Sequence, residues 1–212
     1  LIFDQFPLTL NVQVVGTAIP HTPITNGDVT AMGFNHWSVA FPARFTAFSP
    51  LLELRATDTL SSMTDQVILP VSGVTVTIEA WKLAGSAVDL GTQIANLKSW
   101  LAANEQSSGP YLHGSRFVAF FHLGGMEYEG GTTTGVGALR HETFHSWYAR
   151  GLKPASQPDG WWDEAWTVYN DLGASGSSLP VSMSWMYERG IAAASAATTR
   201  IRRVSFGNHL AQ

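Results

Sequence analysis

The chain has 212 residues, of which 45% are hydrophobic; this supplies enough apolar material for a buried core and excludes general disorder. Charged residues make up only 13% and the net charge is −4, so no broad basic surface for nucleic acid is expected. Thr, Ser, Gly or Pro interrupts every apolar run, which excludes a membrane-spanning segment. Cysteine is absent, which excludes disulfides, thiolate metal ligands and a cysteine nucleophile.

The composition also bears on where the protein works. Low charge together with many Gly, Ser, Thr and Trp residues favours a secreted or cell-envelope bacterial protein. The sequence begins at Leu1 and shows no cleavable signal pattern, so we expect processing or truncation upstream.

The first part of the chain is predicted to consist of strands. Residues 8–15 alternate in part between apolar and polar side chains, and residues 51–60 and 74–83 are predicted as further strands. Residues 19–33 contain Pro and Gly, which predicts a loop.

A boundary is predicted where Pro50 follows an irregular aromatic stretch. It separates a β-rich N-terminal segment, residues 1–49, from a second domain, residues 50–212. We expect the N-terminal segment to be the remainder of a preceding β-domain or an extra layer on the second domain's sheet.

Helical periodicity begins after Asp89, which is placed to cap a helix. Apolar side chains recur at helical spacing from Leu90 to Leu101, and the sequence Ser-Ser-Gly-Pro at 107–110 ends the pattern. A near-continuous apolar strand follows at 116–123 and is broken by Gly124 and Gly125.

Further helices are predicted at 135–150 and 160–172, because Gly and Pro residues end the first and Asp159 and Gly173 bound the second. The last forty residues contain an Ala-rich helix candidate and a short basic cluster.

The sequence His-Glu-Thr-Phe-His at 141–145 carries the candidate chemistry. Histidines four residues apart lie one helical turn apart on the same face, so His141 and His145 can reach one ion. Glu142 points toward the place where a metal-bound water would lie, which suits a general base.

A catalytic zinc site normally has three protein ligands and one open position. Glu164, separated from His145 by eighteen residues, is the candidate for the third. Asp171 lies two turns further along the same helix face and is a candidate to accept a hydrogen bond from a ligating histidine.

This pattern resembles the gluzincin metallopeptidases. The Ser146-Trp147 pair, the Trp-x-x-Glu-x-x-Thr-Val-Tyr sequence around Glu164 and the Gly-Gly-Met-Glu sequence at 124–127 are similar to the group of aminopeptidase N, leukotriene hydrolase and the glycyl aminopeptidases. The resemblance covers about residues 110–172 most specifically.

The resemblance implies an α+β, thermolysin-like zinc-peptidase domain. Its mixed sheet has an edge strand on the cleft and packs on the His-Glu-x-x-His helix and on the helix of the Glu ligand. Strands precede this domain, and the helical part after it is short, so the chain is expected to be a truncated or minimal relative.

The resemblance also implies roles for residues at the cleft. Gly125 offers its backbone to an extended peptide and Glu127 holds the free amino group of the substrate. Tyr128 replaces the Asn usual in the family. Family members use a Tyr to stabilise the oxyanion, and Tyr187 lies closer to Glu164 than that residue normally does.

The implied activity is zinc-dependent peptide hydrolysis, with one Zn²⁺ per chain and Glu142 as the base. Three hypotheses stay open: an aminopeptidase, an endopeptidase with an open cleft, and a zinc-containing binding module without turnover. A peptide is the expected substrate, and other fragments of a processed precursor or further copies of the chain are possible partners.

Overall fold

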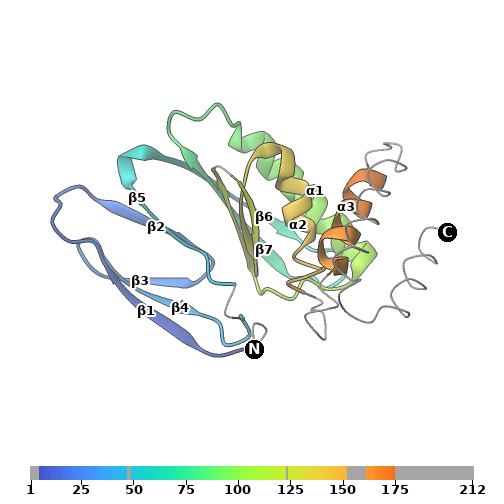
Figure 1. Ribbon diagram of the computed structural model, residues 1–212, viewed down its shortest axis with the longest axis horizontal. Coiled ribbons are helices and arrows are strands. Elements are labelled where there is room, and N and C mark those ends of the chain that lie inside the picture. The colour runs from blue at the N-terminus through green and yellow to red at the C-terminus, as the bar shows by residue number, and fades with distance from the viewer. Residues whose placement is uncertain (1–4, 47–48, 123, 152–160, 175–212) are drawn as a thin grey trace. The chain divides into compact units, whose positions relative to one another are not determined.

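In the computed structural model, the described residues are 5–46, 49–122, 124–151 and 161–174 (Figure 1). The chain divides into two compact units, Leu1–Lys153 and Pro154–Gln212. The boundary predicted near Pro50 stays a prediction.

The N-terminal part of the first unit contains two small antiparallel sheets. Strand β4 (His36–Phe41) lies between β1 (Leu8–Gln13) and β3 (Asp28–Gly33). Strand β2 (His21–Thr25) pairs with β5 (Leu52–Ala56). Alternate side chains of β4 are buried, as expected for a strand with one face on a core.

The prediction of a loop over 19–33 is therefore wrong, because β2 and β3 lie within it. Among the described strands, β2 pairs only with β5. A proline such as Pro23 is tolerated in an edge strand of this kind, because its missing N–H need not break a ladder.

A five-stranded mixed sheet forms the main layer of the first unit. Its strands, in order, are β6 (Leu60–Ile68), β7 (Thr75–Leu83), β8 (Arg116–Phe121), β10 (Gly131–Thr134) and β9 (Gly125–Tyr128). Strand β8 runs parallel to both of its neighbours, and the outer pairs are antiparallel. A short 3₁₀ turn, η1 (Thr57–Thr59), precedes β6. The sheet leaves β9 as an edge strand.

Helix α1 (Leu90–Ser108) connects the parallel strands β7 and β8, and its predicted start is confirmed. The Asp89 carboxylate accepts a hydrogen bond from the N–H of Gly91 at 3.0 Å, which caps the first turn. Ile94, Leu97 and Leu101 are fully buried in the main core with residues of β7 and β8. Burial of this apolar stripe fixes the helix on the sheet (Figure 1).

The predicted helix over 135–150 is shorter than expected. A 3₁₀ turn, η2 (Val136–Ala138), leads into α2 (Leu139–Phe144), and turns follow as far as Gly151. Ala149 has a φ of 92°, a left-handed conformation in which an α-helix cannot continue. Helix α2 packs against β9, β10 and α1, so it covers the sheet beside its edge strand.

In the second unit, α3 (Trp161–Ala174) confirms the helix predicted over 160–172. The Ala-rich helix candidate, the basic cluster and Tyr187 lie outside the described residues. Within the described part of the chain, no helix is long and apolar enough to cross a bilayer. The α+β class predicted from the sequence is confirmed.

Glu105 stabilises the first unit from the last turn of α1. Its carboxylate is completely buried and accepts hydrogen bonds from the N–H groups of Val71, Ser72 and Tyr111 at 2.8 to 3.3 Å. Burial raises the pKa of Glu105, but the side-chain contact with Ser72 and the three N–H donors outweigh it and leave the pKa below its ordinary value.

Replacing Glu105 by Gln is expected to lower the free energy of unfolding by about 2 kcal/mol at pH 7, because one amide oxygen replaces two charged acceptors. A folded-state pKa below the unfolded one gives stability that is present above about pH 4.3, the ordinary Glu pKa, and is lost as the pH falls through the folded pKa. The difference between wild type and variant in urea titrations should therefore shrink below pH 4. A difference that is constant from pH 7 to pH 3 would contradict this role.

Candidate metal centre

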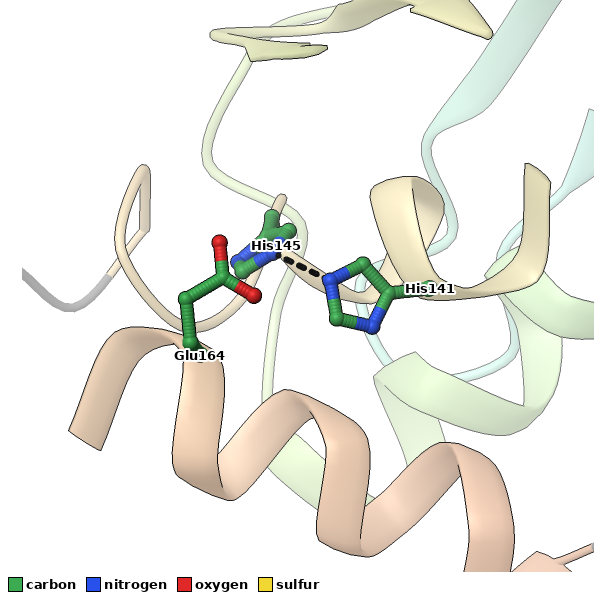
Figure 2. Close-up of side chains that lie close together, drawn as sticks. All are labelled: His141, His145 and Glu164. Carbon is green, nitrogen blue, oxygen red and sulfur yellow. Dashed lines mark hydrogen bonds between the residues drawn. The ribbon is translucent and has the colours of Figure 1, made fainter. Parts of the chain in front are cut away.

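His141 and His145 face each other at the end of α2. Their Nε2 atoms are 3.0 Å apart and the two rings meet edge to face, with an interplanar angle of 83° (Figure 2). The one-turn spacing predicted from the sequence is thus realised, although His145 lies at the helix C-cap and not inside a long helix.

The surroundings of His145 select its tautomer. The ring is fully buried, and its Nδ1 lies 3.3 Å from the carbonyl oxygen of Tyr148, to which only a protonated Nδ1 can donate. In the neutral ring the lone pair is then on Nε2, the atom that faces His141. Histidines that ligate metals are commonly oriented through such a contact of the outer nitrogen. The pair therefore fits a divalent cation.

Glu142 points from α2 toward the edge strand β9. Its side chain is largely buried, and a Cβ added to Gly125 would collide with its Oε1 atom. Gly125 therefore allows the carboxylate to lie directly against the backbone of β9. The structure brings these two predicted site residues together.

Glu127 lies two residues further along β9, in register with Thr132 of β10. One carboxylate oxygen of Glu127 is within 4.8 Å of a ring nitrogen of His145. Its Oε1 accepts a hydrogen bond from Arg150 Nη2 at 2.9 Å, which makes an ion pair. The first unit thus brings Gly125, Glu127, Glu142 and the two histidines to one end of α2.

Arg150 is the site residue that the sequence did not reveal. It follows the second histidine by five residues, in the turn where the helix had been predicted to continue. On a continuous helix, Arg150 would not lie on the same face as His145, so its pairing with Glu127 was not expected.

Glu164 and Asp171 lie on α3 of the second unit, seven residues apart and so on one helix face. Figure 2 draws Glu164, from the first turn of α3, together with the histidine pair. The roles predicted for these two carboxylates stay predictions.

No family model and no curated protein matches the sequence. Solved structures do match. An M1 zinc metallopeptidase from Deinococcus radiodurans aligns with a TM-score of 0.60 and 18% identity, over 82% of this chain and 42% of that one. A two-domain M1 zinc metallopeptidase bound to L-tryptophan gives the same TM-score and identity, over 82% and 41%. The chain has the fold of the M1 zinc metallopeptidases.

An aminopeptidase N family protein from Idiomarina loihiensis matches as well, with a TM-score of 0.57 and 13% identity over 82% of this chain and 35% of that one. The resemblance to the gluzincin group of aminopeptidase N is therefore confirmed at the level of the fold. The chain spans about two fifths of the length of these M1 structures.

Proposed function

We propose that the chain is the catalytic part of a zinc-dependent peptide hydrolase of the aminopeptidase type, with a thermolysin-like domain formed by residues 50–212. The observation that carries this proposal is the end of α2, where two facing Nε2 atoms lie beside a buried glutamate that contacts the backbone of an edge strand. Supporting it are the solved M1 zinc metallopeptidases of the same fold, one of which was determined with a Tyr-Ser-Ala substrate.

One zinc ion per chain is proposed to bind to His141, His145 and Glu164. These side chains offer two imidazole nitrogens and a carboxylate oxygen, which are common ligands of catalytic zinc, and the chain has no cysteine to offer instead. Asp171 is proposed to accept a hydrogen bond from the outer nitrogen of one of the ligating histidines. Zinc in such a site polarises the scissile carbonyl and activates a water.

The remaining steps belong to residues of the chain. An extended substrate is proposed to add to β9, which is the edge strand of the sheet among the described residues, because backbone groups at a sheet edge can bond to a peptide. Glu142 takes a proton from the attacking water and passes it to the leaving amine. The closeness of its carboxylate to Gly125 supports a role beside a peptide bound along β9.

Glu127 is proposed to bind the ammonium group of the substrate's first residue. The same carboxylate already pairs with Arg150, and this observation favours the second candidate, an endopeptidase. A carboxylate whose charge is compensated by an arginine attracts an ammonium group less strongly. An endopeptidase needs no such attraction, because its open cleft binds internal segments of a peptide.

Hydrolysis of a dipeptide amide and of its N-acetylated form by the zinc-loaded protein separates the two candidates. The aminopeptidase proposal predicts that the free amine is cleaved with a higher kcat/KM, and that Glu127→Gln removes this preference. Equal or faster cleavage of the acetylated form, with internal cuts in a protein substrate, would establish the endopeptidase instead.

A further inference from the structure

The carboxylate proposed to recognise an amine already holds a cation from the protein. The side chains of Arg150 and Glu127 are only 10% and 12% exposed, whereas those of the Arg116–Glu79 pair are 28% and 23% exposed. Water screens an ion pair more strongly the more the pair is exposed, and a nearly buried pair is screened least. The charge of Arg150 therefore acts on Glu127 with little attenuation.

The turn that follows α2 is built to hold Arg150 in this place. Trp147 anchors it, being buried in the main core with its Nε1 donating to the carbonyl of Gly109 at 2.7 Å. Ala149 adopts a φ of 92°, which is costly for a residue with a Cβ. The N–H of Arg150 then donates to the carbonyl of His145 at 3.0 Å.

Gly151 completes the turn. A Cβ at this position would come within 2.7 Å of the carbonyl oxygens of Ser146 and Trp147. Only glycine fits such an approach of backbone to backbone. A strained alanine and an obligatory glycine thus flank the arginine, which indicates that its position is fixed by the backbone and not by chance contact on a surface.

The Arg150–Glu127 ion pair has a consequence for ligands along β9. A substrate ammonium group and the guanidinium group must share one carboxylate, and like charges close together weaken each other's binding. An N-acylated or internal peptide segment carries no ammonium group, so Arg150 does not compete with it for Glu127.

We propose that Arg150 is a specificity-determining residue that competes with the substrate ammonium group for Glu127 and so shifts preference from free amino termini toward acylated or internal peptide segments. This inference rests on the proposed function. It makes the Arg150–Glu127 ion pair a determinant of the preference between exopeptidase and endopeptidase action.

Calorimetric binding of phenylalaninamide and of N-acetylphenylalaninamide to the zinc-loaded protein tests this proposal without turnover. In Arg150→Gln, we expect about tenfold tighter binding of the free amine, whereas binding of the uncharged acetylated ligand should stay within twofold of wild type. Lys98→Gln is the matched control, since it removes one positive charge from the half-exposed pair with Asp65, and both affinities should stay within twofold of wild type. Unchanged or weaker binding of the free amine in Arg150→Gln would overturn the proposal.

Arg150→Lys gives a second reading if the Gln variant does not fold. It keeps the charge and most of the stem, so the ratio of the two affinities should stay within threefold of wild type, and a tenfold change would overturn the argument from charge. Absence of amine binding in both wild type and variants would overturn it as well. A wild type that binds both ligands with the expected shifts but hydrolyses no peptide would refute the proposed function and leave the role of Arg150 standing.

Discussion

Replacing Glu142 by Gln is expected to lower kcat for a dipeptide amide by about a thousandfold, the range of effect of a general base. The variant keeps the shape of the side chain against Gly125 and the two histidines beside it, so zinc content should not change. Steady-state kinetics together with metal analysis of the same preparation measure both quantities.

Glu53→Gln is the control for this variant. Glu53 lies on β5 in a half-exposed pair with Arg55, and its loss should leave kcat within twofold of wild type. If Glu142→Gln retained the wild-type rate, Glu142 would not be the base. If wild type and variant both bound zinc and neither hydrolysed peptides, the chain would be the binding module without turnover.

Replacing Glu164 by Ala is expected to reduce bound zinc from about one ion per chain to less than about a tenth under the same dialysis, because a site with two neutral imidazoles alone binds the ion far more weakly. His145→Ala should have the same effect. Removing a hydrogen-bond partner of a ligand costs less, so Asp171→Asn should weaken zinc binding by about 10- to 100-fold.

The melting temperature gives a second readout of the same variants. A ligand that binds only the folded chain stabilises it by about 4 kcal/mol at a thousand times its Kd. Added zinc should therefore raise the melting temperature of wild type and leave that of Glu164→Ala nearly unchanged. Full zinc content in Glu164→Ala would exclude this glutamate from the ligand set.

The long helices were predictable from the sequence. Helix α1 has an Asp cap and a buried stripe ending at Leu101, so local signals and tertiary packing agree there. Helix α3 begins just after Asp159 and Gly160 in the sequence and ends one residue beyond Gly173, close to the predicted bounds.

Helix α2 was overestimated because it ends at Phe144, and no local signal marks this end or the positive φ of Ala149 in the turns that follow. Ala149 lies between the buried Trp147 and Gly151, where a Cβ would collide with backbone carbonyl groups.

The candidate site likewise contains one arrangement that was predictable from the sequence and one that was not. The spacing of His141 and His145 predicted two facing imidazoles, because four residues make one helical turn. The pairing of Arg150 with Glu127 was not predictable, since it joins residues 23 positions apart through a sheet edge and a strained turn. Interactions of this kind follow from the register of β9 on β10 and of α2 on the sheet, which no local pattern encodes.

X-ray absorption at the zinc edge of the stoichiometrically loaded protein tests the central claim most directly. The account predicts a zinc ion with nitrogen and oxygen ligands at about 2.0–2.2 Å and the outer-shell scattering of two imidazole rings, reduced to one ring in His145→Ala. A protein that retains no zinc at neutral pH, or a spectrum without two imidazole ligands, would contradict it.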